Sequence, residues 1–118
     1  FQMTNQELQT IQENGLPVKI VIFNNGFLGM VRQWQELFYD DNKQSVDLSQ
    51  PDFVKLADAY GIKGMRAETR AEVRSALRQA VEHSGPVVID VRLLPQENVW
   101  PMVPAGAALS ETIENAKA

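Results

Sequence analysis

The sequence predicts an α/β fold in which a parallel sheet lies between layers of helices. Two short apolar runs, at residues 18–23 and 87–91, are typical of buried strands, and residues 62–66 are a third strand candidate. Segments with helical spacing precede and separate them, which gives the order helix, strand, helix, helix, strand, helix, strand. Alternation of this kind requires crossover connections, and these join parallel strands with a right-handed turn.

The first helix and the first strand follow from local signals. Thr4-Asn5-Gln6-Glu7 has the capping-box pattern, which predicts a helix over about 5–14, and Gly15 followed by Pro17 marks its end. The run VKIVIF, Val18 to Phe23, lacks the alternation of a strand that is covered on one face only. We therefore expect helices on both faces of this strand, as in a parallel sheet.

The dipeptide Asn25-Gly26 after this strand has two interpretations. It is the strongest short signal for a β-hairpin. The apolar positions beyond it, however, recur in helical steps of three and four, at Phe27, Leu28, Met30, Val31, Trp34, Leu37 and Phe38. We therefore expect a turn from a strand into a helix.

The middle of the chain predicts a loop and another helix. Residues 40–49 are polar with few apolar anchors, which indicates a surface loop. The next helix is expected to have Ser49 or Gln50 as its cap and Pro51 in its first turn, and to stop at Gly61.

The last two strands flank a further helix. Ile62 to Arg66 is a strand candidate that Gly64 weakens. Thr69-Arg70-Ala71-Glu72 is a second capping box, and the helix it opens ends at Gly85-Pro86. Val87 to Val91 is the third strand.

These elements divide the chain into two parts. Residues 1–93 are expected to form a three-layer, Rossmann-like domain, and residues 94–118 a C-terminal arm. Pro95 to Ala108 contains three prolines and Trp100, so it does not build a core of its own. Only Leu109 to Ala116 has the pattern of a short final helix.

Composition excludes several classes of function. The 118 residues include 11 basic and 15 acidic side chains, and a net charge of -4 argues against nucleic-acid binding. The absence of Cys excludes disulfides, thiolate metal sites and a cysteine nucleophile. No apolar run is long enough for a membrane span and no signal peptide is visible, so we expect no membrane contact and a cytoplasmic location. A chain that begins with Phe1 is expected to be part of a longer or processed protein.

Few residues are candidates for chemistry. The one histidine, His83, lies near the end of a predicted helix, and neither a Gly-x-Ser-x-Gly elbow nor a Gly-rich phosphate loop occurs. We therefore expect no catalytic residue in this chain. Asn24-Asn25 stands out because ligands of open parallel sheets bind beyond the carboxyl ends of the strands.

Two interpretations of Asn24-Asn25 remain open at this point. Amide and carbonyl oxygens suit Mg²⁺, and the amides that open the next helix favour a phosphate. Together they would form a site for Mg²⁺ and a diphosphate. Alternatively, both asparagines only satisfy backbone groups of the turn.

Longer stretches resemble a known family. Residues 1–39 are similar to the second part of the thiamine-diphosphate binding motif, which begins with Gly-Asp-Gly and ends in Asn-Asn. The pattern of Asn24-Asn25, Gly29-Met30-Val31, Gln33-Trp34 and Leu37-Phe38-Tyr39 resembles the large catalytic subunits of the acetolactate synthase (acetohydroxyacid synthase) family. The stretch PQENVWPMVPAGAALSETI, residues 95–113, is similar to the C-terminal arm of those subunits.

The resemblance implies roles for individual residues near the cofactor. Asn25 would bind Mg²⁺ through its side chain and Phe27 through its main-chain carbonyl. The turn beside the diphosphate would be shaped by Asn24, Gly26 and Gly29, whereas Met30 and Met3 would lie near the thiamine.

The resemblance also implies a substrate channel. Val31, Trp34 and Phe38 would line the path to the reacting carbon, where herbicides of this family bind. The spacing of these three residues alone is equally that of an amphipathic helix packed against a core.

For the whole enzyme, the resemblance implies that pyruvate is condensed with a second 2-oxo acid, using thiamine diphosphate and Mg²⁺, in branched-chain amino-acid biosynthesis. FAD would be bound mostly by another domain. The Gly-Asp-Gly half, with the Asp that binds Mg²⁺, would precede Phe1, and the glutamate that activates the cofactor would come from a neighbouring subunit. The isolated chain is therefore expected to be inactive.

The implied partners are the rest of the catalytic subunit, further copies in a homo-oligomer, and a regulatory subunit. Three alternatives stay open at this stage. The chain could come from a related enzyme such as pyruvate oxidase or glyoxylate carboligase, it could be a non-catalytic α/β binding module, or it could be an inactive degradation product.

Overall fold

The computed structural model describes residues 1–115, which form two compact units. The first unit comprises Phe1–Gly26 and Ser49–Leu94, and the second comprises Phe27–Leu48 and the described residues from Pro95 onward. Each unit is described by itself below.

The first unit is built on a parallel sheet of three strands. They are β1 (Lys19–Asn24), β2 (Lys63–Ala67) and β3 (Val87–Arg92), and β3 lies between the other two. Both pairings are parallel, with Ile22 and Arg66 on either side of Asp90. The predicted α/β fold with parallel strands is therefore confirmed, and the antiparallel hairpin is excluded.

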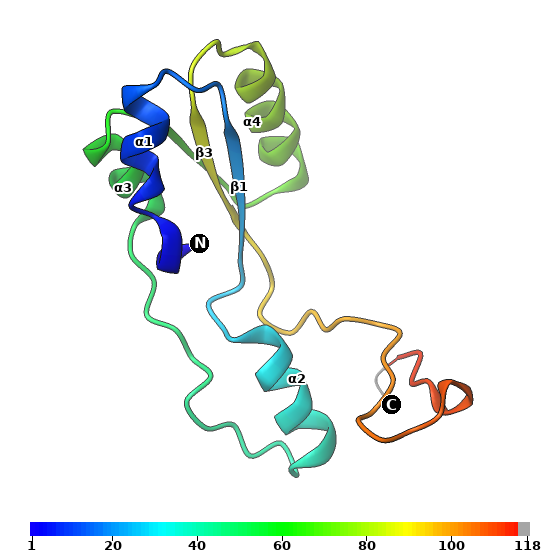
Figure 1. Cartoon of the computed structure of the whole chain (residues 1–118). Coiled ribbons are helices and arrows are strands. Elements are labelled where there is room, and N and C mark those ends of the chain that lie inside the picture. Colours follow the sequence, from blue (N-terminus) through cyan, green and yellow to red (C-terminus); the bar gives the residue numbers. More distant parts are fainter. Residues whose placement is uncertain (116–118) are drawn as a thin grey trace. The chain divides into compact units, whose positions relative to one another are not determined.

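Helices cover both faces of this sheet (Figure 1). The helices of this unit are a 3₁₀ turn (Gln2–Thr4), α1 (Glu7–Glu13), α3 (Phe53–Ala59) and α4 (Arg70–Glu82). One core cluster joins α1 and α3 to the sheet through Leu8, Ala57, Ile62 and Val88. The other joins α4 to the opposite face through Ala67, Ala76, Ala80, Val87, Ile89 and Val91. The three layers predicted from the sequence are thus present. The expectation that helices cover both faces of β1 is wrong, because Val21 and Phe23, on the face that α4 covers at β3, are exposed.

The two predicted capping boxes have different outcomes. At α4 the Thr69 hydroxyl accepts from the Glu72 amide at 3.3 Å, and the Glu72 carboxylate accepts from the Thr69 amide at 3.0 Å. The box at Thr4 is wrong, because the Thr4 hydroxyl donates to the carbonyl of Phe1 at 3.2 Å. Thr4 lies inside the 3₁₀ turn, so it lacks the extended backbone that an N-cap requires.

The predicted cap of the next helix is also wrong. Asp52 caps α3, not Ser49 or Gln50, and Pro51 precedes the helix. One carboxylate oxygen of Asp52 accepts from the amides of Val54 and Lys55 at 3.1 and 3.2 Å. The bond from the Lys55 amide, together with the charge of Arg66, holds the pKa of Asp52 below its ordinary value. A carboxylate is stabilised at this position by the positive end of the helix dipole.

The second unit contains α2 (Gly29–Phe38) and the C-terminal segment. The helix confirms that the chain does not return as a strand after Gly26. Residues 40–49 are not simply a surface loop, because Val46 is fully buried and its carbonyl accepts from the Leu28 amide at 2.9 Å. The predicted helix 109–116 is wrong, since only a 3₁₀ turn (Leu109–Glu111) forms there, and Ala116 lies outside the described residues.

Gly64 in β2 lies in close contact with α3. A β-carbon at this position would lie 2.9 Å from the carbonyl oxygen of Val54 and 3.0 Å from its α-carbon. Neither is the end of a flexible side chain, so the backbone itself would have to move.

We predict that Gly64→Ala lowers the free energy of unfolding by about 1–3 kcal/mol, the usual cost of overpacking. Urea denaturation of the chain measures this. Gly85→Ala is the control, because the nearest atom there is Nε2 of the His83 side chain at 3.2 Å, which can rotate away. Equal stability of the two variants would show that α3 and β2 are not in close contact.

Candidate functional site

The turn at residues 24–26 lies at the carboxyl end of β1. Asn24 is the last residue of that strand and is 5% exposed. Its Nδ2 donates to Oδ1 of Asp90 at 2.9 Å, and its Oδ1 accepts from the Gly26 amide at 3.3 Å. Gly26 has φ +73°, in the left-handed region that glycine adopts without steric cost. Both ends of the Asn24 amide are therefore engaged in holding the turn, and Asn25 is half-buried between the two bonded residues.

A buried carboxylate on β3 accepts a hydrogen bond from Asn24 of this turn. Asp90, in the middle of β3, is 1% exposed. Its Oδ2 accepts from Nε of Arg66 at 3.3 Å, and Nε of Arg92 lies 3.9 Å from the same oxygen. The Arg66 guanidinium also donates to Asp52 at 2.9 Å. The network thus links the carboxyl ends of all three strands to the cap of α3.

Sequence reasoning did not single out Asp90. The one signal that could have found it is a charged residue inside the otherwise apolar run VVIDV, because a buried aspartate has to be paired.

The donor chemistry of the described residues fits part of a magnesium site. No group of three His, Cys, Asp or Glu side chains that could hold a metal occurs within residues 1–115. Mg²⁺ is usually bound by one or two carboxylates, by phosphate oxygens of a ligand and by water. An amide oxygen at Asn25 is a suitable hard ligand, but this part of the chain supplies no carboxylate cluster to complete the shell.

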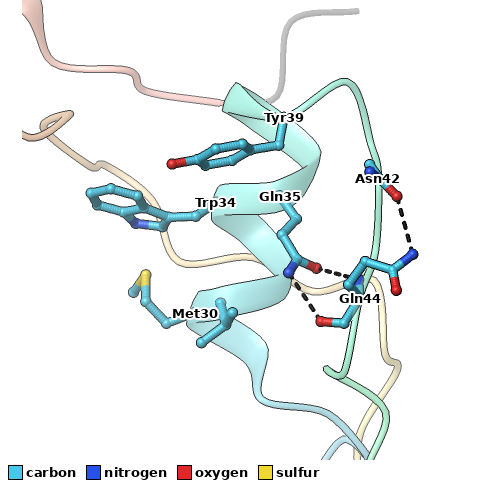
Figure 2. Close-up of a pocket in the computed structure, with 7 residues that line it drawn as sticks. Met30, Trp34, Gln35, Tyr39, Asn42 and Gln44 are labelled. Atoms are coloured by element: carbon cyan, nitrogen blue, oxygen red, sulfur yellow. Dashed lines mark hydrogen bonds between the residues drawn. The ribbon is translucent and has the colours of Figure 1, made fainter.

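The second unit has a pocket of about 540 Å³ on α2. It is lined by Met30, Val31, Trp34, Gln35, Tyr39, Asn42 and Gln44. Met30, Trp34 and Tyr39 project from one side of the helix, while Gln35 points to the segment that carries Gln44 (Figure 2). The Trp34 and Phe38 rings meet edge to face, with centroids 5.5 Å apart. Three predicted site residues, Met30, Val31 and Trp34, therefore share one pocket.

The buried side of α2 is polar. Gln33 is 1% exposed, and it accepts from the Val99 amide at 2.8 Å and donates to the Val99 carbonyl at 2.9 Å. Arg32, also buried, donates to the Asn98 side chain at 3.0 Å, and its Nε lies 2.9 Å from Glu36. The apolar side chains of Met30, Val31 and Phe38 are about half exposed. The polarity of this helix is thus the reverse of a helix packed on a core, which favours a binding surface.

Glu36 contacts both Arg32 and Asn98. Burial raises the pKa of its carboxyl, but the hydrogen bond from Asn98 and the charge of Arg32 outweigh this and keep the pKa below its ordinary value. The carboxylate is therefore ionised at neutral pH and pairs with Arg32.

The remaining predicted residues lie apart from these groups. Met3 is in the N-terminal 3₁₀ turn and is 91% exposed. Gly29 is the first residue of α2, and the Phe27 ring lies 5.4 Å from the guanidinium carbon of Arg32. Asn24, Asn25 and Gly26 belong to the first unit, whereas Phe27, Gly29 and the channel residues belong to the second. Within residues 1–115, no helix is both long and apolar enough to cross a membrane.

Comparison with known proteins identifies the domain. Residues 1–91 match the family described as "Thiamine pyrophosphate enzyme, C-terminal TPP binding domain". The chain belongs to this family.

Relatives of this TPP binding domain include acetolactate synthases. The chain is 49% identical to that of Mycobacterium leprae over 117 residues, which cover 94% of the chain and 19% of the relative. It is 45% identical to the acetolactate synthase of Arthrospira platensis over 108 residues, which cover 90% of the chain and 19% of the relative. The resemblance to acetolactate synthase catalytic subunits is therefore confirmed. The chain spans about a fifth of the length of these relatives.

A solved structure supports the same fold. The thiamine diphosphate-dependent 4-hydroxybenzoylformate decarboxylase of Rhodococcus jostii RHA1 matches with a TM-score of 0.70 and 29% identity. The match covers 76% of this chain and 17% of the decarboxylase chain.

Two glutamines of α2 make the same pair of backbone hydrogen bonds in different surroundings. Gln33 is buried and bonds both backbone groups of Val99. Gln35 bonds both backbone groups of Gln44 at 3.1 Å, at an exposed position.

We predict that Gln33→Leu costs about 1–3 kcal/mol of stability, because it removes two part-buried hydrogen bonds to the backbone of Val99. Gln35→Leu should cost well under half as much, since water can replace its bonds. Thermal melts compare the two variants, and hydrogen exchange at the Val99 amide locates the effect. A Gln33→Leu variant no less stable than Gln35→Leu would contradict the attachment of residue 99 to α2.

Proposed function

We propose that this chain is the C-terminal part of the cofactor-binding domain of an acetolactate synthase catalytic subunit. The observation that carries the proposal is the 43–49% identity to acetolactate synthases over most of the chain. The strand-to-helix turn at Asn25-Gly26 adds support, because it lies at the carboxyl end of a parallel strand, where ligands of such sheets bind.

In this proposal the chain holds one side of thiamine diphosphate and its Mg²⁺. When bound, the cofactor supplies the electron sink for decarboxylation of pyruvate and for addition to a second 2-oxo acid. Asn25 binds the metal through its side-chain amide oxygen, and Phe27 binds it through its main-chain carbonyl oxygen. Asn24, Gly26 and Gly29 shape the turn next to the diphosphate, while Met30 and Met3 lie near the thiamine.

The pocket on α2 is proposed to belong to the substrate channel. Its apolar side chains exclude water from the reacting carbon and contact the second 2-oxo acid. Three facts support this: Val31 is half exposed, Trp34 lines the pocket, and Phe38 packs edge to face on Trp34.

The rest of the proposal concerns parts outside this chain. The complete subunit would contribute the acidic metal ligand, a homo-oligomer would complete the active site, and a regulatory subunit and FAD would bind elsewhere. The products, acetolactate or acetohydroxybutyrate, lead to branched-chain amino acids. The isolated 118-residue chain should not turn over pyruvate, because its described part offers Mg²⁺ no acidic cluster.

The test is product analysis with the complete catalytic subunit that carries this chain. Pyruvate, thiamine diphosphate and Mg²⁺ should yield acetolactate and carbon dioxide. Carbon dioxide and acetaldehyde without acetolactate would instead place the chain with decarboxylases such as the Rhodococcus jostii relative.

We predict that Asn25→Ala in the complete subunit weakens binding of Mg²⁺ and thiamine diphosphate by at least about tenfold, the loss of one metal ligand. Asn14→Ala is the control, since Asn14 ends α1 and its side chain donates only to the Thr10 carbonyl at 2.8 Å. Cofactor titrations followed by calorimetry give both affinities. Equal affinities of the two variants would show that Asn25 forms the turn and does not bind the metal.

We predict that Trp34→Leu keeps the melting temperature nearly unchanged, because this ring lines a pocket that is open to solvent. Its preference for the second 2-oxo acid should shift, and the affinity of channel-binding inhibitors should fall more than tenfold, or about 1.4 kcal/mol. Leu8→Ala is the contrasting control, because Leu8 is fully buried and its truncation should cost about 2–5 kcal/mol. A large drop in melting temperature with unchanged inhibitor affinity would make Trp34 an ordinary core residue.

A further inference from the structure

The buried carboxylate of Asp90 is the centre of a series of contacts that ends at the turn formed by residues 24–26. On one side it accepts from Nε of Arg66 at 3.3 Å, and the guanidinium of Arg66 continues to Asp52. On the other side it accepts from the Asn24 amide at 2.9 Å, and Asn24 in turn accepts from the Gly26 backbone amide at 3.3 Å. Gly26 directly follows Asn25.

An asparagine amide has two ends of similar shape and opposite hydrogen-bonding character. Its NH₂ group only donates, and its oxygen only accepts. An ionised carboxylate only accepts, so it binds the NH₂ end and repels the oxygen end. With Nδ2 of Asn24 held by Asp90, Oδ1 of Asn24 is directed to the Gly26 amide. The reversed orientation would put two oxygens together at Asp90 and two donors together at Gly26.

We infer that Asp90 is a positioning residue: it fixes the orientation of the Asn24 amide and thereby presets the turn that carries Asn25. Its effect on cofactor binding rests on the proposed function, while its effect on the turn does not. The burial of both side chains supports this inference. Asp90 is 1% exposed, so water does not compete for its oxygens, and Asn24 is 5% exposed, so its amide has no solvent to turn to.

The strand order explains why the positioning residue lies so far along the chain. Asp90 is 66 residues from Asn24, yet the parallel pairing of β1 with β3 sets Ile22 beside Asp90 and Asn24 beside Arg92. The two side chains therefore meet diagonally on one face of the sheet, at the edge where the turn begins.

The first experiment measures hydrogen exchange of the Gly26 amide by NMR in the 118-residue chain. Asp90→Asn keeps the shape of the side chain but no longer dictates the amide orientation of Asn24. Exchange at Gly26 should become about tenfold faster, as for the loss of one hydrogen bond. The Leu93 amide, which donates to the main-chain carbonyl of Asn24 at 2.9 Å, serves as an internal reference.

Asp52→Asn is the matched control. It removes a carboxylate from the same series of contacts but does not touch Asn24, so exchange at Gly26 should stay within about twofold of the wild type. Faster exchange at Gly26 in Asp52→Asn, equal to that in Asp90→Asn, would assign the effect to general loosening of the network and overturn the inference.

The decisive variant exchanges the two side chains. Asn24→Asp alone places two carboxylates against each other. In Asn24→Asp combined with Asp90→Asn, residue 24 can accept from both Gly26 and the new amide at residue 90. Protection of Gly26 should therefore return to within about threefold of the wild type. If Asp90→Asn does not fold, this double variant decides: a folded chain with a protected Gly26 supports the inference, and any other result overturns it.

Titration of the complete catalytic subunit with thiamine diphosphate and Mg²⁺ is the second arm. Affinity should fall about tenfold in Asp90→Asn and recover in the double variant. If exchange at Gly26 responds as expected and cofactor affinity does not change, the positioning of the turn stands and the proposed function fails. If exchange at Gly26 is unchanged in Asp90→Asn, the inference itself is wrong.

Discussion

The burial of β3 on both faces is the constraint on which the first unit depends. Its backbone is paired on both edges, by β1 and β2, and its side chains are covered by α1 and α3 on one face and by α4 on the other. A strand without an exposed face can hold a charged residue only if that residue is fully paired. Asp90 meets this condition because the carboxyl ends of the neighbouring strands supply Asn24 and Arg66. Compensation of one buried charge thus organises the edge of the sheet at which the proposed cofactor site lies.

Under the proposed function, each unit contributes to ligand binding in a different way. In the first unit, polar groups buried in the sheet hold a backbone turn in a fixed shape. In the second, Arg32 and Gln33 are buried against residues 98–99, so the apolar residues of α2 are directed outward. An exposed apolar helix face costs solvation energy unless something covers it. Under the proposed function, the substrate is what covers the apolar side chains of the pocket beside Trp34.

Local patterns were sufficient to predict β3, because a strand buried on both faces needs a continuous apolar run. A similar run predicted β1, although Val21 and Phe23 of that strand are exposed. The same patterns could not predict the Asp90 network. Its bonds join residues up to 66 positions apart, and they form only because β3 lies between β1 and β2. Val46 was missed for a related reason: a single apolar residue in a polar segment has no periodicity. The cap of α3 was misplaced because Asp52 competes with Ser49, and tertiary contact with Arg66 favours the carboxylate.

The pair of adjacent asparagines gains a physical explanation from this geometry. Asn24 is the last residue of β1, and Asn25 follows the strand. The Asn24 amide bonds to Asp90 and accepts from the Gly26 amide, so it is used in the turn. One asparagine therefore serves the structure of the turn, and under the proposed function the next one serves the metal. A single asparagine could not do both, because an amide oxygen that accepts from Gly26 in a buried position cannot also reach a ligand outside the sheet. Under the proposed function, the two adjacent asparagines therefore divide these two roles between them.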